Sequence, residues 1–128
     1  MNKENKLVPG LPSGFEDRWG KKLLLKKKLL KAIENNFIKF GAEAIETSTF
    51  EISRNIGSFL AEDDSNPMSD VFSFQDGDES LTARYDLSSP LARFYAQNNQ
   101  ELPLIFKRYQ IQNVFRNEKS GNGRYREF

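Results

Sequence analysis

The stretch FRNEKSGNGRYREF, residues 115–128, carries the side chains whose types and spacing are best suited to chemistry. Residues two apart on a strand point to the same side, so Arg116 and Glu118 are expected to share one face. The Ser-Gly-Asn-Gly segment between them and the last residues predicts a turn that brings the chain back beside itself. One sheet surface would then present Arg116, Glu118, Arg124 and Phe128 together.

Each of these side-chain types has a use in binding a nucleoside triphosphate. Arginine forks bind phosphate oxygens, a carboxylate accepts a hydrogen bond from an exocyclic amine, and a phenyl ring stacks on a base. The set therefore predicts an ATP site that does without a glycine-rich phosphate loop. A salt-bridged, exposed hairpin is the alternative, because an Asn-Gly turn is common in plain hairpins. From the residues alone, both interpretations remain open.

The composition excludes several other kinds of chemistry. The chain has 128 residues, which allows one ordinary domain at most. Lysine and arginine number 19 against 18 for aspartate and glutamate, so the whole chain offers no electrostatic argument for nucleic acid or membrane. Cysteine and histidine are absent, which removes disulfides, thiolates and the commonest metal ligand. Without a long apolar run, we expect a soluble, cytoplasmic protein.

The first half of the chain is expected to supply a lead-in and one long helix. Residues 7–20 are rich in proline and glycine, which predicts an extended lead-in. From Lys21, apolar residues recur every four positions up to Phe37, which predicts an amphipathic helix that ends at Gly41. The many lysines of this helix are interpreted as a solvated face, with an RNA-facing surface as the alternative.

The middle of the chain predicts short elements around an acidic loop. Residues 41–51 resemble a strand, and a short helix is expected over residues 52–57. The acidic residues of the following loop suggest calcium, but the glycine and final glutamate of a calcium loop are missing, so a solvated loop is favoured. This acidic group is Glu62, Asp63, Asp64 and Asp70. Residues 71–84 then predict a hairpin with its turn at Asp76 and Gly77.

The last third predicts a helix and then strands. Ser89 is a natural N-cap and Pro90 suits the first helical position, so a helix is expected to begin there and fade near residues 98–99. Residues 104–118 are rich in β-formers and predict one long or bulged strand. The order of elements predicts an α+β fold with a mostly antiparallel sheet.

Several segments, in order along the chain, resemble one family. FRNEKSGNGRYREF is similar to the second sequence motif of class II aminoacyl-tRNA synthetases, an Arg-x-Glu, a variable loop and an Arg-x-x-x-Phe. SLTARYDLSSPLARFYA, residues 80–96, is similar to the histidine-recognition segment of histidyl-tRNA synthetases. VFSFQDGDE and LPSGFEDRWG resemble the alpha-proteobacterial branch of that family. The resemblance covers nearly the whole chain.

The resemblance implies a fold and a place within a longer protein. Residues 21–128 would be the N-terminal part of a class II synthetase catalytic domain, an incomplete antiparallel sheet with flanking helices, preceded by the lead-in of residues 1–20. The chain stops inside the second motif region, and the third motif and the anticodon-binding domain are not in it. We therefore expect a fragment that is inactive and poorly stable alone, with sheet edges and apolar faces uncovered.

The resemblance also assigns roles to the chemical side chains. Arg116 would be the catalytic residue, holding the ATP α-phosphate and the carboxylate of histidine. Glu118 would meet adenine, Arg124 the γ-phosphate, and Phe128 would stack on the base. The histidine substrate would be bound by Arg116 together with a loop made of Asp86, Leu87 and Ser88. The alternative role for Asp86 is to cap the helix that follows it.

The implied reaction is that of a histidine–tRNA ligase. Histidine would attack ATP to give histidyl-adenylate, which then transfers its histidine to tRNA(His), with Mg²⁺ assisting by family resemblance; no metal ligand is assigned in this chain. The family is homodimeric, but Ser48 stands where its first motif normally has proline, which weakens that inference.

Two other functions remain possible from the sequence. The first is the histidyl-synthetase-like regulatory subunit of ATP phosphoribosyltransferase, which senses histidine without aminoacylating. The second is an RNA-binding hairpin that uses Arg124, Tyr125 and Arg126.

Overall fold

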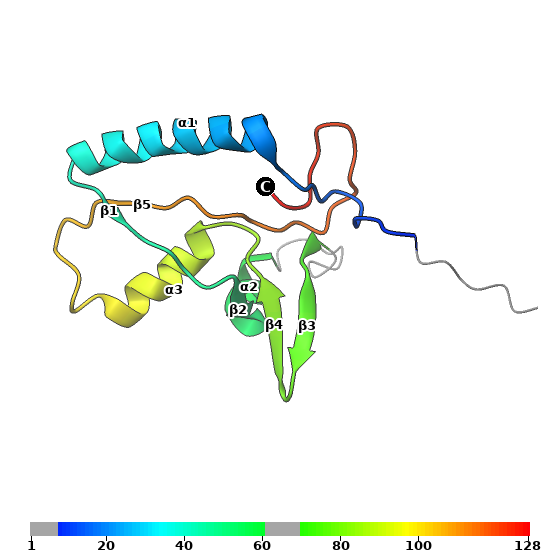
Figure 1. Ribbon diagram of the computed structural model, residues 1–128. Coiled ribbons are helices and arrows are strands. Elements are labelled where there is room, and N and C mark those ends of the chain that lie inside the picture. The colour runs from blue at the N-terminus through cyan, green and yellow to red at the C-terminus, as the bar shows by residue number, and fades with distance from the viewer. Residues whose placement is uncertain (1–7, 61–69) are drawn as a thin grey trace, which may run out of the picture.

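The structure, a computed structural model, describes residues 8–60 and 70–128. Its described part is an α+β arrangement in which one long helix lies along an extended C-terminal segment, with a small sheet and two shorter helices beyond that segment (Figure 1). The C-terminus turns back beside the start of the long helix (Figure 1). This order of elements agrees with the predicted fold class.

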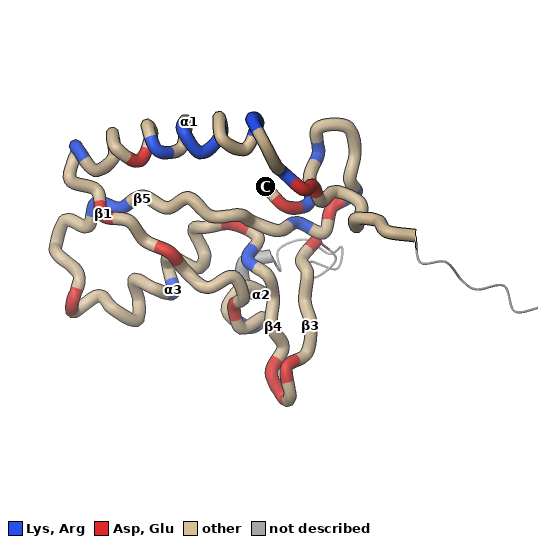
Figure 2. The backbone as a smooth tube through the Cα atoms, viewed as in Figure 1, with Lys and Arg blue, Asp and Glu red and all other residues tan. Residues whose placement is uncertain are grey.

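The predicted long helix is confirmed as α1, Gly20–Lys39. It ends because Gly41 adopts a positive φ of 75° and donates its amide hydrogen to the carbonyl oxygen of Ile38, 2.9 Å away. The lysines lie along its exposed surface (Figure 2). One side of the helix end packs inward, where Phe37 stacks on Tyr109 with ring centroids 5.6 Å apart. The rest of the apolar stripe stays largely exposed, as at Leu29, which is 61% exposed.

The single strand expected over residues 41–51 is wrong, because the segment divides between two sheets. β1, Glu43–Ala44, pairs in parallel with β5, Arg108–Tyr109. β2, Phe50–Ile52, pairs instead with the hairpin in an antiparallel sheet of order β2-β4-β3. Between them Thr47 leaves the ladder, since its amide hydrogen bonds to the side-chain oxygen of Gln112, 2.9 Å away.

The predicted hairpin is confirmed as β3, Ser73–Asp76, and β4, Glu79–Ala83. Asp76 pairs with Glu79, so the turn residues are Gly77 and Asp78, one position later than expected. Gly77 has a positive φ of 59°, which glycine adopts without strain. The hairpin places the end of β4 directly before the loop that the resemblance assigns to histidine.

The two shorter helices are present with shifted boundaries. α2, Ser53–Leu60, begins one residue later than predicted and runs longer. α3, Ser88–Asn98, has Leu87 at its N-cap, so the prediction that Ser89 is the N-cap is wrong. The physical reason is that the carboxylate of Asp86 accepts the amide hydrogen of Ser89 at 3.0 Å. Pro90 is tolerated inside the first turn because amides there have no partner within the helix.

The long strand expected over residues 104–118 is mostly wrong. Only the two residues of β5 form a ladder, and residues further on are extended and make isolated contacts, such as the bridge of Phe115 with Glu127. The acidic residues Glu62, Asp63 and Asp64 lie outside the described residues, so neither interpretation of that loop is tested. Within residues 8–60 and 70–128, no helix is long and apolar enough to cross a membrane.

The apolar core of the described residues is small. It comprises Ile45, Ile56, Val71, Ala83 and Val114. These residues come from the segments that surround β4 and the C-terminal extended chain. The core therefore supports the junction between the hairpin, the loop after β4 and residues 113–116, where the predicted site lies.

Candidate functional site

The C-terminal residues fold back on themselves, as predicted. Val114 and Phe128 exchange two main-chain hydrogen bonds of 2.8 and 3.2 Å, and the amide of Arg116 donates to the carbonyl of Arg126 at 2.9 Å. Gly121 and Arg124 close the turn. This pairing puts Val114 opposite Phe128, so the strand carrying Arg116 lies beside the end of the chain.

Three of the four predicted ATP residues gather around one tyrosine. The guanidinium carbon of Arg116 lies 4.4 Å from the ring centroid of Tyr85 and 5.2 Å from that of Phe128. The hydroxyl of Tyr85 donates a hydrogen bond to Oε1 of Glu118 at 3.2 Å. Arg116, Glu118 and Phe128 therefore share one small region, which we call the Tyr85 cluster.

The environment of the Tyr85 cluster is partly shielded from water. Burial raises the pKa of the Tyr85 phenol, and the hydrogen bond and negative charge of Glu118 act in the same direction, against the lowering effect of the Arg116 charge. Nε of Arg116 also points to the backbone carbonyl of Tyr85 at 3.5 Å, a long contact. The phenol therefore stays protonated at neutral pH and serves as a hydrogen-bond donor.

Arg124 lies apart from the Tyr85 cluster. It sits at the hairpin turn, where it lines a pocket of about 390 Å³ with Ser13, Gly14 and Phe15 of the lead-in. Arg124 thus lies beside the N-terminal lead-in.

Arg126 contacts Phe72 and the lead-in. The chain bends at Arg126, whose guanidinium carbon lies 4.6 Å from the ring centroid of Phe72 and also contacts the side chain of Asn117. Its amide donates to the carbonyl of Gly14 at 2.8 Å. Arg126 therefore holds the lead-in against the C-terminal residues that fold back on themselves.

Asp86 and Ser88 line a second hollow, a pocket of about 710 Å³ between α2 and α3. Asp86 caps α3 through Ser89, which is the alternative role considered for it, and Leu87 is the N-cap residue itself. The lining of this pocket does not include the Tyr85 cluster. Asp86 is joined to that cluster only through the short loop that also carries Tyr85.

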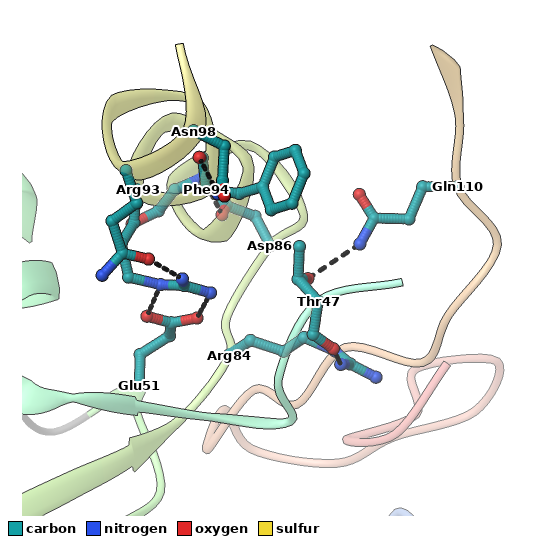
Figure 3. Close-up of polar contacts among 10 residues, drawn as sticks. Thr47, Glu51, Arg84, Asp86, Arg93, Phe94, Asn98 and Gln110 are labelled. Carbon is teal, nitrogen blue, oxygen red and sulfur yellow. Dashed lines mark hydrogen bonds and ion pairs between the residues drawn. The ribbon is translucent and has the colours of Figure 1, made fainter. Parts of the chain in front are cut away.

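A bidentate ion pair that the sequence analysis missed forms one wall of the 710 Å³ pocket. Arg93 donates from Nε and Nη2 to the two carboxylate oxygens of Glu51, at 2.6 and 2.8 Å (Figure 3). Glu51 is only 4% exposed. The hydrogen bond to Glu51 raises the pKa of Arg93. The pair fixes α3 against β2, and no local sequence pattern indicates it.

Arg84 is a second missed residue, buried at the end of β4 with 4% exposure. Its Nε donates to the carbonyl of Asn113 at 2.6 Å and its Nη1 to the carbonyl of Thr47 at 3.1 Å. Its own carbonyl accepts from the amide of Phe115 at 3.0 Å. Burial lowers the pKa of this guanidinium, with the charges of nearby glutamates opposing the effect. Arg84 thus joins the loop after β4 to the strand that carries Arg116.

A polar network continues on the far side of Thr47. Nε2 of Gln110 donates to Oγ1 of Thr47 at 2.8 Å (Figure 3). Nε2 of Gln112 donates to the Thr47 carbonyl at 3.2 Å. The network holds the irregular segment between β1 and β2 in place.

The described residues do not provide a metal site. No group of three or more histidine, cysteine, aspartate or glutamate side chains in this part of the chain could hold a metal ion. Mg²⁺ that binds with ATP is held largely by phosphate oxygens and one or two carboxylates, so the Mg²⁺ that the resemblance implies stays a prediction.

No family model matches the chain. It is 77% identical over 128 residues to a histidine–tRNA ligase from Pelagibacter ubique, covering the whole chain and 28% of that protein. It is 46% identical over 119 residues to the histidine–tRNA ligase of Methylocella silvestris, covering 92% of the chain and 24% of the relative. The chain thus spans about a quarter of the length of the curated relatives it matches.

Solved structures agree with these relatives. The histidyl-tRNA synthetase of Nostoc sp. PCC 7120 superposes with a TM-score of 0.74 at 27% identity, over 93% of the chain and 26% of that structure. A protein described as an ATP phosphoribosyltransferase regulatory subunit/histidyl-tRNA synthetase from Bacillus halodurans superposes with a TM-score of 0.76 at 24% identity, over 95% of the chain and 31% of that structure, which shows a shared fold only. The predicted fold is confirmed. The chain therefore belongs to the histidine–tRNA ligase family.

Proposed function

We propose that the protein to which this chain belongs is a histidine–tRNA ligase, which uses ATP to convert histidine to histidyl-adenylate and transfers the histidine to tRNA(His). The observation that carries the proposal is the Tyr85 cluster, in which an arginine, a carboxylate and a phenyl ring meet at one place. The 77% identity to a histidine–tRNA ligase supports the same assignment. We place the activity in the cytoplasm, where tRNA is charged.

The chemistry asks the protein mainly for positioning and charge. The carboxylate of histidine attacks the α-phosphorus of ATP in line, and pyrophosphate leaves. Two anions must approach, so a fixed guanidinium at the α-phosphate offsets charge that grows in the transition state. Arg116 is suited to this role because two aromatic rings flank its guanidinium group and leave its N–H edge to bind oxygens. Phe128 would then exchange its contact with Arg116 for the adenine ring.

The other assigned residues take roles at the ends of the substrates. Arg124, at the turn, would bind the γ-phosphate end of an extended ATP. Asp86, with Leu87 and Ser88, would bind histidine from the 710 Å³ pocket side, and its carboxylate has a second oxygen available beside the one that accepts from Ser89. The carboxylate of histidine would reach past the loop of residues 85–88 to the α-phosphate at Arg116, which lies beside that loop.

The proposal is tested by Arg116→Ala in the longer protein that carries this chain. We expect histidine-dependent exchange between ATP and pyrophosphate to fall by about 10²- to 10³-fold, as for the loss of one preorganised donor to developing charge. Arg54→Ala is the matched control, because Arg54 is exposed and forms a surface ion pair with Glu79, 3.3 Å away. Full exchange activity in Arg116→Ala would refute the role.

The regulatory subunit of ATP phosphoribosyltransferase is the second candidate. The Bacillus halodurans protein carries both descriptions, so its likeness in fold does not separate them. The Tyr85 cluster favours the ligase, because a histidine sensor has no need to keep an ATP-binding set together. Histidine binding by the longer protein without any ATP–pyrophosphate exchange would favour the regulator instead.

We also propose that the longer protein acts as a homodimer. Residues 41–51 would contribute to the contact, and Ser48 in that segment is exposed and open to a partner. Light scattering of the longer protein at several concentrations measures this directly, and a monomer at all of them would exclude it.

A further inference from the structure

Tyr85 directly precedes Asp86, which we propose to bind histidine. Its side chain contacts Arg116 and Glu118, which we propose to bind ATP. Its ring faces the guanidinium of Arg116, with 4.4 Å from the guanidinium carbon to the ring centroid. Its hydroxyl reaches in the same direction to Oε1 of Glu118, 3.2 Å away. Nothing in the sequence motifs singles out Tyr85, yet it is the side chain through which Arg116 and Glu118 are connected.

The two contacts of Tyr85 act differently. A ring beneath a guanidinium supports its plane without using its N–H groups, so these stay available for phosphate oxygens. A phenol O–H that donates to one carboxylate oxygen restricts the rotation of that carboxylate and leaves the second oxygen free to accept. Glu118 therefore has one oxygen held by the protein and one oxygen open to a ligand.

We propose that Tyr85 is a positioning residue for nucleotide selectivity, whose hydroxyl holds Glu118 so that its free oxygen accepts a hydrogen bond from the exocyclic amine of adenine. This inference rests on the proposed function, because it assumes that ATP binds at the Tyr85 cluster. It adds a residue and a reason for base choice that the motif residues alone do not contain.

The chemistry of the base makes the proposal specific. Adenine presents an amine at the position where hypoxanthine, the base of inosine triphosphate, presents a carbonyl oxygen. A fixed carboxylate oxygen accepts from the amine but repels the carbonyl, so ATP is preferred over inosine triphosphate. A carboxylate that is free to rotate away loses part of this preference, because it avoids the repulsion and forms the favourable bond less often.

The test compares Tyr85→Phe with the unchanged longer protein that carries this chain. Histidine-dependent exchange with pyrophosphate is measured with ATP and with inosine triphosphate, and the two values of kcat/KM are divided. We expect Tyr85→Phe to lower the ATP preference by about 3- to 10-fold, the size expected for one hydrogen bond. Phenylalanine keeps the ring under Arg116, so the variant removes the hydroxyl alone. The ratio does not depend on how much of the variant is folded.

Two further variants show whether the effect passes through Glu118. In a Glu118→Ala background, adding Tyr85→Phe should leave the ATP preference unchanged, since the acceptor of the Tyr85 hydroxyl is gone. Tyr95→Phe is the matched control, because Tyr95 is an exposed tyrosine on α3 away from the cluster, and it should behave as the unchanged protein.

The outcomes separate the two proposals. An unchanged protein that shows no histidine-dependent exchange would overturn the proposed function and this inference with it. An active protein whose ATP preference is absent, or is the same in Tyr85→Phe, would overturn the inference and leave the proposed function standing. An equal drop in the Glu118→Ala background would also overturn it, because Tyr85 would then act by another route.

Discussion

At the scale of single residues, Arg84 stands out because a buried cation binds only backbone carbonyls. Its guanidinium reaches the carbonyls of Thr47 and Asn113, which belong to segments far apart in the sequence. Buried charges are costly unless their hydrogen bonds are satisfied, so such a residue persists where several chain segments must be joined. Here the joined segments are those that carry the loop after β4 and Arg116.

We predict that Arg84→Ala destabilises the longer protein by about 2–4 kcal/mol. The change removes the two hydrogen bonds from the guanidinium to the carbonyls of Thr47 and Asn113 and opens a cavity at the end of β4. Denaturant unfolding, followed by fluorescence, measures the loss. Arg54→Ala serves as the control, because this exposed arginine has only a surface ion pair and should change stability by less than about 1 kcal/mol.

Asp86 is a single residue for which two roles were considered. Asp86 accepts the amide hydrogen of Ser89 with one carboxylate oxygen and lines the 710 Å³ pocket as well. A helix cap is a sufficient physical reason for an aspartate at this position. Its proposed contact with histidine therefore depends on the second oxygen and on the proposed function.

At the scale of elements, the lead-in packs against the C-terminal residues and has a structural role beyond its connection to α1. Gly14 has a positive φ of 84°, and its carbonyl accepts from the amide of Arg126. A Cβ atom at Gly14 would come within 2.6 Å of the side chain of Arg126. Position 14 thus needs glycine, both for the backbone conformation and for the close approach to Arg126.

We predict that Gly14→Ala releases the lead-in from the C-terminal residues and lowers the free energy of unfolding by about 1–2 kcal/mol. Limited proteolysis of the longer protein should then cut within residues 8–18 faster than in the unchanged protein. Gly10→Ala is the matched control, because a Cβ atom there would meet nothing within 4 Å and its φ is not positive. Equal cleavage rates in the two variants would contradict this account.

The spacing of apolar residues predicted some of these elements correctly and others not. The stripe at every fourth position correctly indicated α1, and the alternation around Gly77 correctly indicated the hairpin. Residues 41–51 and 104–118 also have the composition of strands, but they pair only in short pieces. The reason is that their partners change along the segment, from β5 to Gln112 to β4.

At the scale of the whole molecule, the described chain leaves much apolar surface in contact with water. Trp19, Phe40 and Leu104 are among the exposed side chains, with Phe40 77% exposed, while the buried apolar core is small. Large exposed apolar surface in a monomer marks a face that another part of a protein covers. This agrees with a chain that spans about a quarter of the length of its relatives.

We predict that the chain of residues 1–128 alone melts without a sharp cooperative transition and binds the dye ANS. Burial of the small apolar core offsets too little of the conformational entropy lost on folding. The apolar stripe of α1 also stays largely exposed in the described residues. Calorimetry and dye fluorescence measure both properties, with the longer protein as the control. A sharp cooperative melt of the short chain would count against the prediction.

The sequence by itself determined the long helix, the β3–β4 hairpin, the return of the C-terminal residues and the set of residues that resembles the ATP and histidine motifs. These are local properties, because turn chemistry, spacing and motif order are all contained in neighbouring residues. The resemblance also indicated the family, which the comparisons confirm. Arg116, Glu118 and Phe128 lie close together as predicted, whereas Arg124, which was predicted to join them, lines the pocket beside the lead-in.

Only the tertiary structure decided which residues support that set. Tyr85 under Arg116, Arg84 between two distant carbonyls, and the pair of Glu51 with Arg93 all join segments about 30 to 40 residues apart. The break in residues 41–51 likewise depends on Gln112, 65 residues from Thr47. No local pattern encodes such contacts, because their free energy arises from two segments that become neighbours only when the chain folds.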